Sequence, residues 1–159
     1  MKNNSQSGFT LIEILIVIGL IAILATVVLV ALNPARQFAQ ARNSQRTSNV
    51  NTILNAIGQR IADNKGLFRV TTDTTCTAAM DIPTASSIID MVGVAGHVDL
   101  RPCLVPTYIA EIPVDPLNGT AWTGSTYNTN YNLIKDTTTG RVTVSAPSAE
   151  LGQGISVTR

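Results

Sequence analysis

The chain has 159 residues, of which 45% are hydrophobic, 13% are charged and 4% are aromatic. A soluble domain of this size usually carries about a quarter charged residues, so about half of the expected charge is missing. The net charge of +1 argues against nucleic-acid binding driven by bulk electrostatics. Two cysteines and one histidine do not make a four-ligand zinc site of the usual kind. We therefore infer no nucleic-acid partner and no cofactor.

Most of the apolar excess lies in one segment near the N-terminus. The run of aliphatic residues begins at Phe9, and no charged residue occurs from Ile14 to Leu32. These last 19 residues make a helix about 28 Å long, against a hydrocarbon core of about 30 Å. The segment is apolar on every face and longer than the apolar core of a signal peptide, which is about 7–15 residues. We predict a retained membrane-spanning helix over residues 9–32.

One acidic residue, Glu13, lies inside this segment. A carboxylate costs about 2.5–3.5 kcal/mol at the centre of a membrane helix and less near its end. Two interpretations follow from the residues alone. Glu13 either reaches back to the lipid headgroups from one turn inside the span, or it pairs with a positive group that another chain supplies.

The residues before and at the start of the span form a recognisable pattern. A short polar leader is followed by the sequence GFTLIE at residues 8–13, directly before the apolar run. This pattern closely resembles the N-terminal signal of bacterial type IV pilins and type II secretion pseudopilins. The resemblance implies cleavage after Gly8, which removes residues 1–8 as a leader, and N-methylation of the new amino group of Phe9. It also implies that this amine meets Glu13 of a neighbouring subunit, which gives Glu13 a role in assembly.

The same resemblance implies where the protein acts and with what. It describes a single-pass precursor in the bacterial inner membrane, with its head outside the cytoplasm, that later enters a surface pilus or a periplasmic pseudopilus. Its partners would be further copies of the chain, the prepilin peptidase and N-methyltransferase, membrane lipid, and an inner-membrane assembly platform with its ATPase. A count of positive charges around the span predicts the opposite orientation, but the leader motif is more specific. The alternative functions are a type II secretion pseudopilin and a non-polymerising single-span protein that displays a binding head.

The span is predicted to continue as a polar helix. We expect one long, bent helix from about Phe9 to about Asn64, because Pro34 loosens it locally. Residues 33–65 form its amphipathic part, and Phe38 and Ala41 are expected to begin its buried face. Apolar residues at helical spacing mark that face: Val50, Ile53, Leu54, Ile57 and Ile61.

Charge is divided between this helix and the head. Residues 33–65 carry five basic side chains and one acid, a net charge of +4, whereas residues 66–159 carry five basic and eight acidic side chains, a net charge of −3. The arginines are expected to form a solvated helix face. The alternative is that they contact acidic heads of other subunits.

Residues 66–159 predict a small antiparallel β head, so the fold class is α+β and pilin-like. A short helix is expected over Thr84–Val92, and a β-hairpin over residues 127–145 with its turn at residues 136–140. A short strand is expected at residues 155–157. The apolar face of the sheet is expected to cover the apolar stripe of the helix.

Several head residues are candidates for chemistry. The segment around Pro113 resembles a block in major pseudopilins, some of which bind calcium in the following loop, so Asp115, Asn118 and Asp136 are calcium candidates. Ordinary turn chemistry is the alternative. Cys76 and Cys103 predict a disulfide if the head is in an oxidising compartment, worth about 3.5 kcal/mol, and two buried thiols otherwise.

The remaining aromatic and histidine side chains do not suggest a catalytic site. His97 stands without a second metal-binding or nucleophilic motif, so a turn or surface position is expected. Cross-strand packing is the expected use of Trp122, Tyr127 and Tyr131, with a binding patch as the alternative. The sequence therefore predicts a structural protein and not an enzyme.

Overall fold

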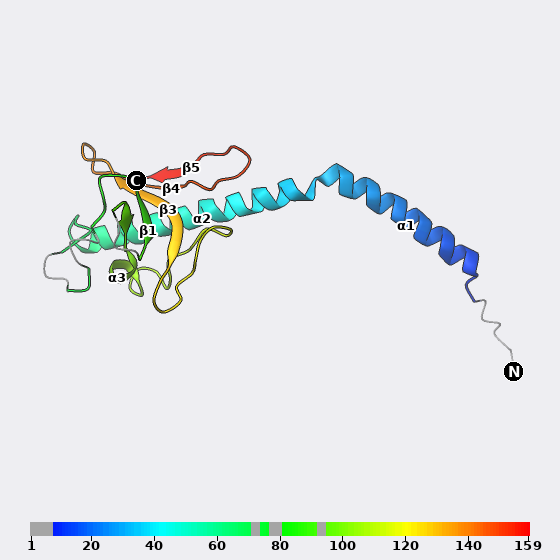
Figure 1. Ribbon diagram of the computed structural model, residues 1–159, viewed down its shortest axis with the longest axis horizontal. Coiled ribbons are helices and arrows are strands. Elements are labelled where there is room, and N and C mark those ends of the chain that lie inside the picture. The colour runs from blue at the N-terminus through cyan, green and yellow to red at the C-terminus, as the bar shows by residue number, and fades with distance from the viewer. Residues whose placement is uncertain (1–7, 71–73, 77–80, 92–94) are drawn as a thin grey trace. The chain divides into compact units, whose positions relative to one another are not determined.

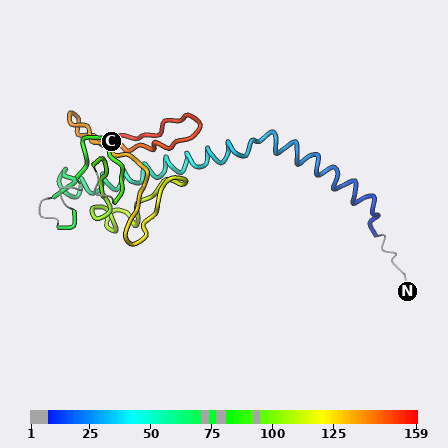
Figure 2. The backbone as a smooth tube through the Cα atoms, in the orientation of Figure 1, coloured from blue at the N-terminus to red at the C-terminus, as the bar shows by residue number. Residues whose placement is uncertain are grey.

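The computed structural model describes residues 8–70, 74–76, 81–91 and 95–159. The predicted leader, except for Gly8, lies outside these residues. The chain divides into two compact units, Met1–Phe38 and Ala39–Arg159. The ribbon in Figure 1 and the backbone tube in Figure 2 show the elements of each unit.

The first unit contains helix α1, Leu11–Leu32, whose side chains are all exposed. Within the described residues it is the one helix long and apolar enough to cross a membrane. It begins at Leu11 because Thr10 has an extended backbone and caps it. The membrane-spanning helix expected over residues 9–32 is thus a helix over almost all of that range.

A single residue separates α1 from the next helix. Asn33 has a left-handed backbone with φ 42°, and α2 then spans Pro34–Asp63. The side-chain oxygen of Asn33 accepts a hydrogen bond from the Arg36 amide at 3.3 Å, so Asn33 ends one helix and caps the other. Proline suits the first position of a helix because its missing N–H has no intrahelical partner there. The long helix predicted from the sequence is therefore interrupted at Asn33, and its second part ends at a glycine turn around Gly66, as expected.

The second unit packs α2 against a sheet. In the described part of the chain the sheet order is β2-β1-β3-β4-β5, with β1–β2 parallel and the other pairs antiparallel. Figure 1 shows α2 running alongside these strands. The bounds are β1 Ser87–Asp90, β2 His97–Val98, α3 Arg101–Leu104, β3 Asn128–Lys135, β4 Val142–Ala146 and β5 Ile155–Thr158.

The core lies between α2 and one face of the sheet. Val50, Ile53, Leu54 and Ile57 are buried, and Ile61 packs partly buried at the edge of the same cluster. Alternate residues of β3 and β4 point into this cluster, as the pleat of a strand requires. The predicted apolar stripe and its cover by the sheet are therefore confirmed.

The predicted hairpin and the last strand are confirmed, but two local predictions are wrong. Residues 87–90 form β1 instead of the helix expected over Thr84–Val92 (Val92 itself lies outside the described residues), because they pair with β3. Phe38 and Ala41 do not lie on the buried face of α2, since both are exposed. The residues that continue this face toward the N-terminus are Ala39, Asn43, Arg46 and Asn49.

Candidate functional site

The N-terminal end of α1 holds the predicted processing and assembly residues in an open arrangement. Gly8 is exposed, with no atom within 4 Å of where a side chain would begin, and Phe9 is 84% exposed. Because glycine has no side chain, a protease can approach the backbone closely at this position. The peptide bond after Gly8 therefore lies in an accessible, non-helical segment, as the predicted cleavage requires.

Glu13 is held within its own chain by a capping box. Its Oε2 atom accepts hydrogen bonds from the backbone N–H and the hydroxyl of Thr10, both at 2.8 Å. The Glu13 amide in turn donates to the Thr10 hydroxyl at 3.3 Å. Both groups that hold the carboxylate belong to Thr10, so cleavage after Gly8 leaves this arrangement intact. It fixes the Glu13 carboxylate one turn from the amine that cleavage would create on Phe9.

The second candidate site is a buried ion-pair cluster on α2, which we call the Arg46 cluster. Arg46 Nε lies 2.6 Å from Asp115 Oδ2, and both side chains are 0% exposed. Arg46 Nη1 also donates to Glu150 Oε2 at 2.8 Å and to Asn43 Oδ1 at 3.0 Å. Arg42 Nη2 contacts Glu150 Oε1 at 2.6 Å from the more exposed side. One arginine of α2 thus binds two segments of the head that are far apart in sequence.

This cluster corrects the expected solvated arginine face. Arg46 is buried and Arg42 is half-buried, and both pair with acids of their own head. The desolvation of a guanidinium is tolerated only when its donors are satisfied, and the five-donor fork of Arg46 meets two carboxylates and an amide here. Acidic residues of the same chain therefore neutralise part of the net positive charge of residues 33–65.

The Arg46 cluster shifts the pKa of both carboxyl groups downward. Burial raises the pKa of Asp115, but hydrogen bonds from Arg46 and from the Asn118 and Leu117 amides outweigh it, so the pKa lies below its usual range. Hydrogen bonds from Arg42, which has the larger effect, and from Arg46 lower the pKa of Glu150 to about 2. Both groups stay ionised well into the acid range because the folded head binds their charged forms.

The pKa of Glu150 predicts how the stability of the head depends on pH. Folding lowers the pKa of Glu150, so its ionised carboxylate stabilises the folded head. This contribution to the free energy of unfolding is fully present above the ordinary pKa of 4.5 and is lost as the pH falls toward 2. We expect the melting temperature of the head to fall between pH 5 and pH 2, with a shallower fall in Glu150→Gln. Circular dichroism melts at each pH measure this. Identical slopes for the two proteins would contradict the assignment.

The calcium candidates take part in turn and ion-pair contacts. Asp115 Oδ1 accepts from the amides of Leu117 and Asn118, both at 2.9 Å, while its other oxygen faces Arg46. Asp136 lies in the β3–β4 turn and accepts from the amides of Thr138 and Thr139. Asp115 and Asn118 are thus in one turn and Asp136 in another. The described residues contain no group of three or more histidines, cysteines or acids that could hold a metal ion.

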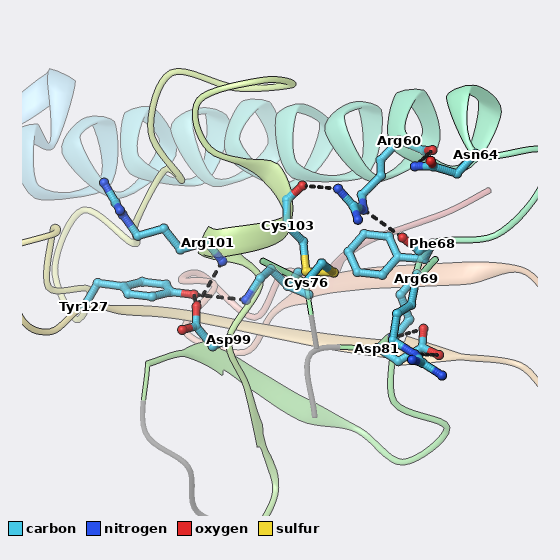
Figure 3. Close-up of a disulfide and its surroundings, with 12 residues drawn as sticks. Arg60, Asn64, Phe68, Arg69, Cys76, Asp81, Asp99, Arg101, Cys103 and Tyr127 are labelled. Atoms are coloured by element: carbon cyan, nitrogen blue, oxygen red, sulfur yellow. Dashed lines mark hydrogen bonds and ion pairs between the residues drawn. A yellow bond between two sulfur atoms is a disulfide. The ribbon is translucent and has the colours of Figure 1, made fainter. Parts of the chain in front are cut away.

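The predicted disulfide between Cys76 and Cys103 is present, with an S–S distance of 2.01 Å. Figure 3 shows Arg60 of α2 beside it. The guanidinium donates to the carbonyl oxygens of Phe68 and Cys103, each at 2.7 Å, and lies 5.4 Å from the centre of the Phe68 ring. The disulfide-bearing segment is therefore tied to the C-terminal part of α2 by a buried arginine that sequence reasoning did not single out.

The aromatic residues serve mainly in packing. Tyr127 and Tyr131 are buried in the core, and the rings of Trp122 and Tyr127 meet edge to face at 6.3 Å. The Arg101 guanidinium lies 4.0 Å from the centre of the Trp122 ring. The packing interpretation of the tyrosines is confirmed.

His97 does not occupy the turn or surface position expected from the sequence. It lies in β2, and its Nδ1 is 2.6 Å from Oδ2 of the buried Asp90. The histidine thus helps to satisfy a buried carboxylate beside the short parallel pair of strands.

Comparison with known proteins identifies a motif in the N-terminal segment. A model described as the prokaryotic N-terminal methylation motif matches residues 3–29. This range includes Gly8, Phe9 and Glu13 and most of α1, and the motif implies processing by a prepilin peptidase. No curated protein and no solved structure was found to match the chain. The chain carries a prepilin-type N-terminal methylation motif on a pilin-like α+β fold, consistent with a structural protein of the type IV pilin and pseudopilin family.

Proposed function

We propose that this chain is the structural subunit of a type IV pilus-like filament. The observation that carries the proposal is the methylation motif at residues 3–29, which leads directly into an apolar helix whose side chains are all exposed. Residues 1–8 are removed after Gly8, and the amine of Phe9 is methylated. Residues 9–32 first anchor the precursor in the inner membrane and then form the filament core. Residues 33–65 and 66–159 present the head outside the cytoplasm.

Assembly in this proposal depends on one pair of charges. Glu13 Oε2 is bound to Thr10, and within the described residues Oε1 has no hydrogen-bond partner. That oxygen can accept the methylated amine of Phe9 from another copy. Each charge is costly alone in an apolar helix bundle and tolerable when paired, so the pair selects the axial register at which a subunit enters.

The partners follow from this route. A prepilin peptidase and N-methyltransferase would process the chain, and an inner-membrane platform with its ATPase would drive addition of subunits. A type II secretion pseudopilin is the second candidate, favoured by the resemblance of the segment around Pro113 to major pseudopilins. Long fibres on the cell surface support a pilin, whereas short periplasmic fibres with impaired secretion on deletion support a pseudopilin.

Replacement of Glu13 tests the charge pair. We expect Glu13→Ala to reduce fibre yield by more than about tenfold, because it leaves the amine of Phe9 from another copy without its negative partner in an apolar helix bundle. Fibres sheared from cells and quantified by immunoblot give the yield.

Glu13→Gln is the matched control for the capping box. Glutamine can still accept the hydrogen bonds from Thr10, so it keeps the cap and removes only the charge. We expect it to lose fibres to the same extent as Glu13→Ala. Wild-type yield from Glu13→Gln would show that capping, and not charge pairing, is what assembly needs.

A further inference from the structure

Two loops of the head carry exposed leucines at the same end of α2. Leu117, in the loop between α3 and β3, is 58% exposed, and Leu151, in the loop between β4 and β5, is 50% exposed. Each loop also carries an acid that binds Arg46, so both loops lie on the face of α2 that Arg46 occupies. Figure 1 shows the two loops, in yellow and in orange to red, at the end of the head nearest the N-terminal part of α2.

Packing within the head does not account for the position of Leu151. Its backbone is left-handed with φ 60°, a conformation that bulky apolar residues rarely adopt. The loop is held in place, because the Asn43 side chain donates to the Glu150 carbonyl at 2.8 Å and accepts from the Glu150 amide at 3.0 Å. An exposed apolar side chain that is held in a costly backbone conformation indicates a contact outside the head.

The chain itself brings this end of the head close to a membrane. Helix α1 is long and apolar enough to span one, and α2 begins at Pro34, two residues after the last residue of α1. Asn43 lies nine residues after Pro34, which is about 14 Å of helix. The headgroup region extends about 5–7 Å beyond each side of the hydrocarbon core. A tilt of α2 toward the face that carries Arg46 therefore lowers both loops into this region.

The charges near these loops agree with a lipid surface. The acids that adjoin the leucines, Asp115 and Glu150, are both paired with arginines of α2. Between Glu13 and Asp63 the chain contains no acid, and Arg36 on the first turns of α2 is exposed. A cation close to a span attracts the phosphates of anionic lipids. Apolar side chains together with a nearby positive charge are typical of a contact with the membrane interface.

We propose that Leu117 and Leu151 insert into the headgroup region of the membrane that α1 spans, so that the head of the precursor lies against the lipid surface. Two side chains alone bind a bilayer weakly, but the span keeps them beside it, where their effective concentration is high. The contact determines which side of the head faces the membrane before a subunit is added to a filament. This inference rests on the membrane anchoring in the proposed function.

Nitroxide labels test the contact on the full chain in vesicles of phosphatidylethanolamine and phosphatidylglycerol. Leu117→Cys and Leu151→Cys each take the label at one site, because Cys76 and Cys103 are bonded to each other. The measured quantity is the ratio of collisions with lipid-soluble oxygen to collisions with a water-soluble nickel chelate. We expect this ratio to be several-fold higher at both sites than at Thr138→Cys, an exposed position in the turn at the other end of β4. Equal ratios at the three sites would overturn the proposal.

A second pair of variants tests whether the apolar side chains cause the contact. When Leu151→Asp is combined with the label at Leu117→Cys, we expect the collision ratio to fall to the level of Thr138→Cys, because anionic headgroups repel the carboxylate. Leu67→Asp is the matched control, since Leu67 is an exposed leucine beyond the C-terminal end of α2, and it should leave the ratio unchanged. A ratio that Leu151→Asp does not lower would count against the contact.

Dilution with lipid distinguishes a lipid surface from a second copy of the chain. A contact with lipid predicts collision ratios that do not depend on the protein-to-lipid ratio. Ratios that fall to the level of Thr138→Cys on dilution would show that a second copy covers the leucines, and the proposal would be wrong.

A label at Ala25→Cys, in the middle of α1, reports on the anchor itself. Frequent oxygen collisions at Ala25→Cys with water-like collisions at both leucine sites would overturn this contact and leave the proposed anchoring standing. Water-like collisions at Ala25→Cys would overturn the anchoring as well.

Discussion

Replacement of Arg46 by methionine is expected to lower the free energy of unfolding of the head by about 3–5 kcal/mol. The substitution leaves the carboxylate of Asp115, which is fully buried, without its positive partner 2.6 Å away. It also removes one of the two arginines that hold Glu150. Urea denaturation of the full chain in detergent measures the loss, with fluorescence of Trp122, the single tryptophan, as the probe.

Two further variants show whether the buried charge is the cause. Arg42→Met removes a half-exposed partner of Glu150, and we expect a much smaller loss because solvent screens that pair. Arg46→Met combined with Asp115→Leu removes both buried charges, and we expect it to be more stable than Arg46→Met alone. Equal losses from Arg46→Met and Arg42→Met would contradict the account of the Arg46 cluster.

Loss of the Cys76–Cys103 disulfide is expected to lower the free energy of unfolding by about 3.5 kcal/mol. The bond closes a loop between residues 27 positions apart, and without it the unfolded chain gains conformational freedom. The hydrogen bonds from Arg60 to Phe68 and Cys103 involve backbone carbonyls and survive reduction, so the loss should not exceed this value by much. Urea denaturation with and without a phosphine reductant gives the difference.

The control for reduction is the double variant Cys76→Ser, Cys103→Ser. Its urea midpoint should lie close to that of the reduced wild-type chain and should not change when reductant is added. A wild-type midpoint that is insensitive to complete reduction would show that the disulfide does not restrict the unfolded chain.

The sequence predicts the parts of this fold that local patterns determine. The spacing of the stripe from Val50 to Ile61 and the turn at residues 136–140 specify the buried helix face and the hairpin without any distant partner. The N-terminal motif is equally local. The strand β1 is different, because the short run around Ile88 fits a helix or a strand and pairing with β3 decides between them.

The Arg46 cluster was beyond local reasoning for a similar reason. Asp115 and Glu150 lie 69 and 104 residues from Arg46 along the chain. An arginine in a sequence does not by itself indicate a buried acidic partner. One signal was present, however. Counting back from Val50 by helical steps reaches Arg46, Asn43 and Ala39, whereas Phe38 and Ala41 fall off the stripe. Polar residues in phase with an apolar stripe deserve to be treated as candidates for a buried network.

The most direct test of the account is the mass of the N-terminus of the mature protein, measured on the full chain from cells that contain a prepilin peptidase. We predict a chain that begins at Phe9 with one methyl group on its amine, and no trace of residues 1–8. A chain that begins at Met1 would contradict the account, because no free amine would then lie one turn from Glu13 and the span would be a permanent anchor.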